Sequence, residues 1–232
     1  THRILRGRKW TFFHGVRAWW LDRPYRARED EPLWRRAAKH AAEAWRRGSR
    51  PSLASRADKI PPPIRERYAA ERRSEWSEEL LPGSSPFSFR FAAGVDHLAW
   101  RYPTNSELVD YRLFAITDGG RPAGYVVLRV VEDGLVVAQA DASSVDALAG
   151  GVFQSLVAGE AAVGKATWAV MNCCSHEIGE RLRAFGFVAE EREHPLALGT
   201  AAGPVDLGTD TSSWLVNRDW ADIGFIAIGT EL

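Results

Sequence analysis

The chain has 232 residues, 45% of them apolar, and its 30 basic side chains balance 30 acidic ones. That length suits one large or two small domains of ordinary globular composition. No apolar run approaches the ~18–20 residues of a membrane-spanning helix, and the basic, aromatic start does not resemble a signal peptide. The two cysteines, Cys173 and Cys174, are adjacent, which disfavours a disulfide, so we expect a reducing, cytoplasmic location.

The neutral total hides an uneven distribution of charge. Residues 1–50 carry 14 basic against 5 acidic side chains, whereas residues 101–232 carry 9 against 18. A basic arm on an acidic body suits an anionic partner. The alternative, which we favour, is that these charges are solvated or face each other, because exposed ion pairs contribute little energy.

Aromatic and basic residues alternate in the first segment, residues 2–20. Residues 10–13 and 16–21 are predicted strands. The pattern also suits a membrane surface or nucleic acid, because aromatic rings stack and basic groups contact phosphates. We favour buried strands with basic edges, and we do not expect nucleic acid as a partner.

Three segments that follow have helical patterns. Residues 33–47 place leucine, alanine and tryptophan on one face, with Gly48 as a stop signal. Residues 64–76 come directly after Pro63, a residue common at helix starts. A shorter helix is predicted over residues 91–102.

Three strands joined by tight turns come next, over residues 111–116, 125–131 and 135–140. The joints are Asp118-Gly119-Gly120 and Glu132-Asp133-Gly134. Glycine accepts the positive φ that hairpin turns require, so the three strands are predicted to form an antiparallel meander.

A long amphipathic helix is predicted over residues 145–161, because apolar residues recur at helical spacing. Ser143 and Asp146, three residues apart, are typical of a capping box. Gly150 and Gly151 fall inside the helix, where glycine costs about 1 kcal/mol relative to alanine. We therefore expect these glycines to permit close packing.

A short apolar strand over residues 167–171 and a helix over 177–185 complete the pattern. Gly186 stands where a glycine commonly ends a helix. The predicted order is β-β-β-α-β-α, followed by further strands.

This order resembles the core of the GNAT acyltransferase superfamily. More narrowly, it is similar to the second half of bacterial proteins with two such domains in tandem, and to GNAT-like domains encoded beside polysaccharide-biosynthesis genes. The similarity spans about residues 95–225. The motifs that carry it are Trp100-Arg101-Tyr102-Pro103, residues 118–125, Leu182–Phe187, His194-Pro195-Leu196, and the run from Trp214 to Asp222.

The resemblance implies a mixed α/β (α+β) fold with a central, mostly antiparallel sheet flanked by helices. It places a GNAT-like domain at residues 64–232. Residues 1–63 would be the tail of a preceding GNAT half plus a linker, because residues 5–10 are similar to the Gly-Trp close of such a domain.

The function implied is acyl transfer from acetyl-CoA, or another acyl-CoA, to an amine. Family members hold the pyrophosphate with a glycine-rich loop and the backbone N–H groups of a helix N-terminus. On this resemblance, the candidate cofactor-binding residues are Ala138, Gln139, Ala140, Ser143, Ser144 and Asn172.

The candidate substrate-binding residues are Trp100, Arg101, Tyr102 and Asp219. An arginine such as Arg101 can bind a carboxylate or phosphate with two hydrogen bonds. The structural alternative, which we favour, is that Trp100 and Tyr102 pack in the core, that Arg101 pairs with an acid, and that Asp219 caps a turn.

The sequence departs from the family pattern at two positions that acyl transfer from acyl-CoA depends on. The segment from Asp141 to Asp146 lacks the glycines of the phosphate loop, and both carboxylates would repel an anion. Leu182 replaces the tyrosine that in family members protonates the leaving thiolate, and leucine cannot move a proton. No catalytic residue is therefore assigned.

The sequence is compatible with three candidate functions. The favoured one is acyl transfer to a small-molecule amine or a polysaccharide precursor, with a preceding GNAT half as partner. The second is a degenerate, non-catalytic GNAT-like domain for substrate binding or assembly. The third is aminoacyl transfer onto a cell-wall or polysaccharide precursor, for which the basic arm would bind tRNA.

No metal site is expected, because Cys173, Cys174 and His176 are too close in sequence to chelate one zinc ion well. Cys173 beside His176 could act as a nucleophile, but a thiol at a strand end is more often a packing residue.

Overall fold

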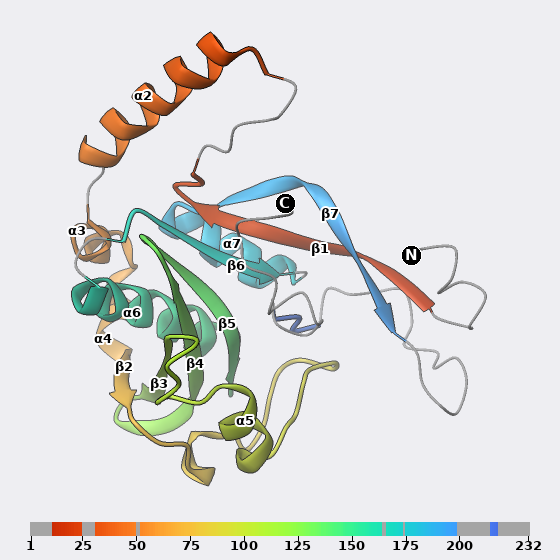
Figure 1. The fold of residues 1–232 in the computed structure, drawn as a ribbon. Coiled ribbons are helices and arrows are strands. Elements are labelled where there is room, and N and C mark those ends of the chain that lie inside the picture. The colour runs from red at the N-terminus through yellow and green to blue at the C-terminus, as the bar shows by residue number, and fades with distance from the viewer. Residues whose placement is uncertain are drawn as a thin grey trace.

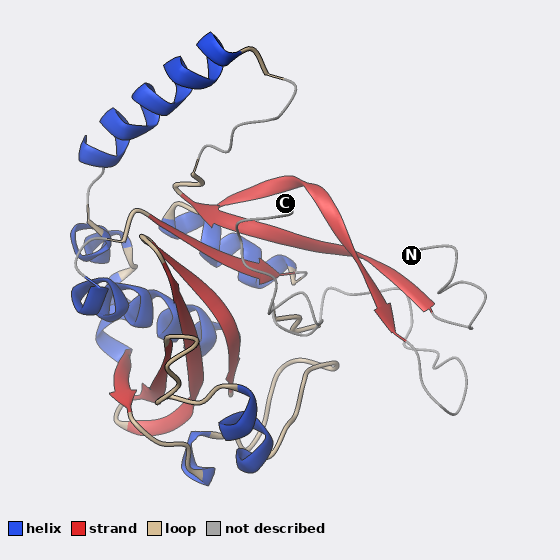
Figure 2. Cartoon of the chain, viewed as in Figure 1, coloured by secondary structure: helices blue, strands red, loops and turns tan. Residues whose placement is uncertain are grey.

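The computed structural model describes residues 11–24, 31–49, 52–163, 166–173, 175–198 and 214–217. Seven strands form one sheet in the order β2-β3-β4-β5-β6-β1-β7, and helices flank it (Figures 1 and 2). All the pairings are antiparallel except that of β5 with β6. The predicted fold class, a mixed α/β protein with a mostly antiparallel sheet, is confirmed.

The strands are β1 (Thr11–Leu21), β2 (Tyr68–Arg73), β3 (Tyr111–Asp118), β4 (Arg121–Val131), β5 (Gly134–Ala142), β6 (Trp168–Cys173) and β7 (Val188–Leu198). The helices are α2 (Leu33–Ser49), α3 (Leu53–Arg56), α4 (Pro62–Arg67), α5 (Val95–Arg101), α6 (Val145–Val163) and α7 (His176–Phe185). Two short 3₁₀ helices lie at Ala57–Lys59 and Glu78–Leu80. No helix within these ranges has the length and apolarity needed to cross a bilayer.

The predicted meander forms, but its two turns differ. Gly119 and Gly120 adopt positive φ between β3 and β4, as expected. In the second turn Glu132 carries the positive φ. Gly134 serves packing instead, because a Cβ there would lie 2.0 Å from the Trp168 ring.

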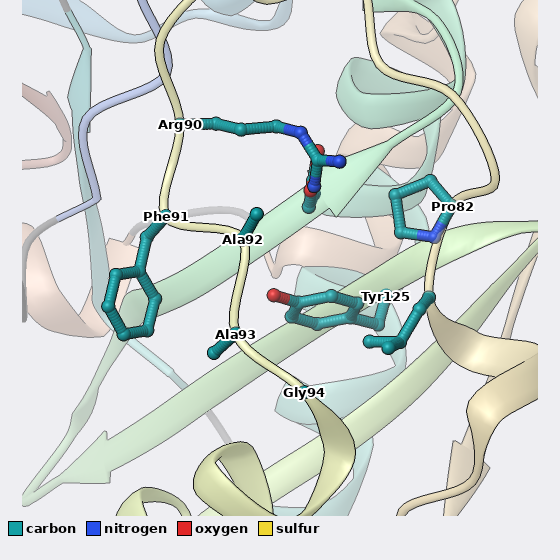
Figure 3. Close-up of a pocket in the computed structure, with 9 residues that line it drawn as sticks. Pro82, Arg90, Phe91, Ala92, Ala93, Gly94 and Tyr125 are labelled. Carbon is teal, nitrogen blue, oxygen red and sulfur yellow. The ribbon is translucent and has the colours of Figure 1, made fainter.

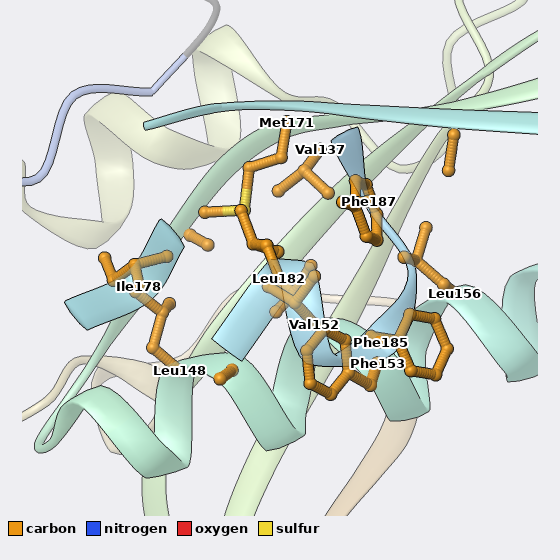
Figure 4. Packing of buried hydrophobic residues seen from close by; sticks show 14 of the residues in the cluster. Val137, Leu148, Val152, Phe153, Leu156, Met171, Ile178, Leu182, Phe185 and Phe187 are labelled. Atoms are coloured by element: carbon orange, nitrogen blue, oxygen red, sulfur yellow. The ribbon is translucent and has the colours of Figure 1, made fainter. Parts of the chain in front are cut away.

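The main core lies between the sheet and α6 (Figure 4). The side chains of Phe153 on α6 and Phe185 on α7 stack with ring centroids 4.2 Å apart. The close packing predicted at the helix glycines is confirmed, since a Cβ at Gly151 would lie 2.3 Å from the Cδ1 atom of Ile116. A Cβ at Gly150 would lie 2.9 Å from Ile64.

Helix α7 has the predicted end. Gly186 adopts φ 105°, its N–H donates to the carbonyl of Arg183, and the N–H of Phe187 donates to the carbonyl of Leu182. At the other end, the Ser175 hydroxyl accepts a hydrogen bond from the N–H of Ile178.

Strand β1 comes from the N-terminal segment and lies between β6 and β7. It is one strand rather than the predicted two, with a positive φ at Gly15 and a register shift between Phe13 and Val16. Residues 11–21 thus belong to the same sheet as residues 68–198. The assignment of residues 1–63 to a preceding GNAT half stays a prediction.

The helix predicted over residues 64–76 is wrong. Helix α4 ends at Arg67, and the chain continues as β2, an edge strand that pairs with β3. Arg67 binds both carboxylate oxygens of Asp118, at 2.6 and 2.7 Å, rather than pairing with Glu71 along a helix. Strand pairing and the burial of Tyr68 therefore override the local helical pattern.

The helix predicted over residues 91–102 is shorter in the structure, where α5 spans Val95–Arg101. Residues 81–94 instead form an extended loop. Pro82 and Arg90–Gly94 of this loop lie over the sheet face opposite α6 (Figure 3), whereas Phe87 packs into the main core.

Candidate functional site

A pocket of about 240 Å³ lies on the sheet face opposite α6. Strands β4 and β5 form its floor, and the two ends of the 81–94 loop, residues 81–82 and 90–94, cover it (Figure 3). The lining residues are Leu81, Pro82, Arg90, Phe91, Ala92, Ala93, Gly94, Tyr125 and Asp141.

Asp141, on β5, is the buried acid of the pocket, with a side chain only 2% exposed. Its Oδ2 atom accepts a hydrogen bond from Nη1 of Arg90. Its Oδ1 atom accepts from the Ser85 hydroxyl at 3.3 Å and from the N–H of Ala142 at 2.9 Å. Burial raises the pKa of Asp141, and the charge and hydrogen bond of Arg90 offset part of that increase.

Tyr125, on β4, points its hydroxyl into the pocket (Figure 3). The Gln139 side-chain amide donates a hydrogen bond to this hydroxyl at 3.3 Å. Burial raises the pKa of Tyr125 far above its ordinary value, so the hydroxyl is neutral at physiological pH. The Oε1 atom of Gln139 is buried without a hydrogen-bond partner among the described residues.

A second segment of the chain holds the pocket cover in place. Trp214 forms an isolated parallel bridge with Phe89, and their ring centroids lie 4.5 Å apart. The N–H of Leu215 donates to the carbonyl of Phe89 at 2.9 Å. Residues 214–217 thereby fix the loop that carries Arg90.

The same segment reaches the candidate cofactor-binding edge of β5. Strand β5 pairs with β6 only from Gly134 to Val136, and the two strands are not paired beyond that point. Farther along β5, beyond Val136, the N–H of Ala140 donates to Oδ1 of Asn217 at 2.9 Å. In return, Nδ2 of Asn217 donates to the carbonyl of Ala140 at 3.2 Å. One side-chain amide thus bonds both backbone groups of Ala140.

Ala138 and Gln139, the other predicted cofactor contacts on β5, are fully buried. Asn172 lies half-buried on β6, where its backbone is paired with that of Ala18. The structure therefore places these residues on adjacent strands, and Asn217 stands at the edge of β5.

The start of α6 is capped by its own residues. The hydroxyl of Ser144, rather than that of the predicted Ser143, accepts the hydrogen bond of Ala147 N–H at 3.1 Å. The N–H of Ser143 donates to the carbonyl of Ala123. Asp146 pairs with Arg181 at 2.9 Å. An anion at this helix end would meet both the capping hydroxyl and a carboxylate.

Leu182, at the position of the family's acid, is fully buried in the main core. It therefore serves packing, and its apolar side chain has no proton to give a leaving thiolate.

The candidate substrate residues separate in space. Tyr102 is 1% exposed, which confirms its packing role, whereas Trp100 is 72% exposed and the packing expectation for it is wrong. The guanidinium of Arg101 lies 5.8 Å from the Tyr102 ring centroid. These three residues are not among the described pocket lining, and Asp219 lies outside the described residues.

Cys173 is buried, and its Sγ atom donates to the carbonyl of Ser175 at 3.2 Å. This contact fits a packing role. Within the part of the chain that the structure describes, no three His, Cys, Asp or Glu residues could hold a metal ion. Cys174 lies outside that part.

Sequence reasoning missed Ser85, Arg90 and Asn217. The first two face Asp141 across more than 50 residues of chain, and Asn217 meets Ala140 across 77. No local pattern marks such partners. The one available signal was the acid at position 141 directly after an apolar strand, because a buried carboxylate needs a paired donor.

Comparison with known proteins gave no match among family models, curated proteins or solved structures. The GNAT resemblance therefore stays a prediction.

The raised pKa of Asp141 predicts how stability depends on pH. An unfolded aspartate titrates near pH ~3.9, and a group with a raised folded pKa loses its stabilising contribution as pH rises through that folded pKa. The free energy of unfolding of the wild type minus that of Asp141→Asn should therefore fall as the pH rises above about 4, through the raised folded pKa of Asp141. Urea unfolding at a series of pH values measures this difference.

Asp96→Asn, at an exposed position of α5, controls for removal of a surface carboxylate. If the free-energy difference between the wild type and Asp141→Asn rises with pH instead, Arg90 outweighs burial and the folded pKa of Asp141 is lowered rather than raised.

Proposed function

We propose that this chain is a GNAT-like domain that binds a small molecule in the Asp141–Tyr125 pocket and does not hold acyl-CoA while Asn217 occupies the edge of β5. The observation that carries the proposal is the pair of hydrogen bonds between the Asn217 amide and both backbone groups of Ala140. The proposed function is the second of the three candidates from the sequence, a non-catalytic GNAT-like domain for substrate binding or assembly.

The occupied strand edge opposes a cofactor on energetic grounds. A ligand that pairs with the backbone of Ala140 must first displace the Asn217 amide. Each hydrogen bond that the displaced Asn217 amide loses without replacement costs about 1–3 kcal/mol. Displacement would also disturb Leu215 and Phe89, because the same short segment holds both.

The start of α6 supports the same conclusion. Pyrophosphate binding at a helix N-terminus uses free backbone N–H groups and favourable electrostatics. Here the Ser144 hydroxyl already accepts the N–H of Ala147, and Asp146, paired with Arg181, places a carboxylate in the first turn.

The pocket offers hydrogen-bond donors. Because the Tyr125 hydroxyl accepts from Gln139, its own proton can be donated to a ligand. Arg90 uses Nη1 for Asp141 and presents further N–H groups, and its side chain is 27% exposed. Because Arg90 balances the charge of Asp141, these donors suit a carbonyl or carboxylate oxygen.

The size of the pocket limits the ligand. About 240 Å³ is below the ~300–1,000 Å³ typical of sites for drug-sized molecules. The ligand class is therefore a small metabolite that carries a carboxylate or amide.

Acyl transfer from acetyl-CoA to an amine is the second candidate. The observation that favours it is the separation of β5 from β6 after Val136, which leaves a strand edge for a ligand once Asn217 has moved away. In this alternative, residues 214–217 leave before the cofactor binds.

Calorimetry with acetyl-CoA separates the two candidates. The wild type should show no saturable binding at millimolar acetyl-CoA, because the β5 edge and the start of α6 are both occupied. Asn105→Ala, which removes an exposed asparagine, is the matched control for Asn217→Ala. Micromolar binding by the wild type would contradict the proposal. Binding only by Asn217→Ala would support the second candidate.

The pocket is tested with small ligands. Thermal-shift titration with acetate, acetamide and methylamine should show stabilisation by acetate or acetamide and none by methylamine. Tyr125→Phe should weaken that binding about tenfold, since the lost hydrogen bond is worth roughly 1.4 kcal/mol.

Tyr111→Phe removes the hydroxyl of another buried tyrosine that does not line the pocket and should leave the affinity unchanged. Selective stabilisation by methylamine would show that the pocket binds amines and would refute the donor assignment.

A further inference from the structure

Helix α2 exposes the side that an ordinary helix buries. Leu33, Trp34 and Trp45 are 76%, 68% and 76% exposed. Figure 1 shows the helix standing apart from the sheet. A helix packed on its own core would turn these side chains inward.

The exposed apolar residues share one face. At about 100° per residue, they lie within an arc of roughly 140°. The residues of this face are Leu33, Trp34, Ala37, Ala38, Ala41, Ala44 and Trp45, and all of them are exposed. They extend over most of a helix of 17 residues, about 25 Å long.

The covered residues lie on the other face. Glu43, roughly opposite the apolar arc, is only 3% exposed, and Arg36 and Lys39 are half-buried. The burial pattern of α2 is thus the reverse of that of α6, whose apolar residues Leu148, Val152 and Leu156 are fully buried.

The charge of α2 identifies the partner. The helix has five basic residues, Arg35, Arg36, Lys39, Arg46 and Arg47, against one acidic residue, Glu43. A basic polar face combined with an apolar face of leucine and tryptophan is typical of helices that lie in a membrane interface. Tryptophan prefers that region because its ring is apolar and its N–H can reach water.

We propose that α2 binds the surface of a membrane rich in anionic lipid. The apolar face enters the boundary between headgroups and acyl chains, and the exposed Arg35 and partly exposed Lys39 contact lipid phosphates. The alanines between the two tryptophans allow shallow insertion. The basic polar face of α2 favours an anionic bilayer over a second copy of the chain, whose α2 helix carries the same positive charge.

Sedimentation with lipid vesicles tests the proposal. The full chain should bind vesicles of phosphatidylcholine mixed with phosphatidylglycerol, and should bind pure phosphatidylcholine vesicles at least about tenfold more weakly, because near-surface basic residues contribute roughly 1 kcal/mol each. Salt at about 1 M should weaken binding to the mixed vesicles, since it shortens the Debye length to ~3 Å.

The double variant Trp34→Ala with Trp45→Ala should bind the mixed vesicles at least about tenfold more weakly than the wild type, because it removes most of the buried apolar area. Trp100→Ala is the matched control, since Trp100 is equally exposed but lies on α5. It should bind like the wild type.

Three results would overturn the proposal. They are no vesicle binding by the wild type, equal loss in the Trp100→Ala control, and a dimer in analytical ultracentrifugation that the double variant abolishes. The last result would assign the apolar face to a second copy of the chain.

Discussion

The unpaired edge of strand β5 is the constraint on which the site depends. Buried backbone groups must find hydrogen-bond partners, and β6 supplies them only as far as Val136. Asn217 supplies both partners of Ala140. This contact holds residues 214–217 at the sheet, Leu215 in turn holds Phe89, and the neighbouring Arg90 is brought to Asp141. The cover of the pocket thus follows from one amide on one strand edge.

The parts of the fold that local patterns encode could be predicted. Helical spacing located α2, α6 and α7, and the glycine turn between β3 and β4 located the meander. Strand β2 could not be located, because Tyr-Ala-Ala-Glu-Arg-Arg has no alternating apolar pattern and becomes a strand only by pairing with β3. The position of β1 between β6 and β7 is a long-range pairing of the same kind.

The candidate site was less predictable than the fold. The sequence marked Asp141 only as a charge that would repel a phosphate. Its partner Arg90 lies 51 residues away, so no local pattern predicted the pair. Ala138, Gln139 and Ala140 were assigned to a cofactor by analogy. In the structure Gln139 bonds Tyr125 and Ala140 bonds Asn217. The resemblance to GNAT proteins pointed to these three positions. The partners that they contact are set by tertiary structure and could not be predicted from the sequence.

Hydrogen exchange at the backbone N–H of Ala140, followed by NMR, tests the central claim most directly. If the Asn217 amide closes the β5 edge, this N–H exchanges slowly in the wild type and much faster in Asn217→Ala, while amides of the β3–β4 hairpin keep their protection. Fast exchange in the wild type, or equal protection in the variant, would show that Asn217 does not hold the strand edge and would contradict the account.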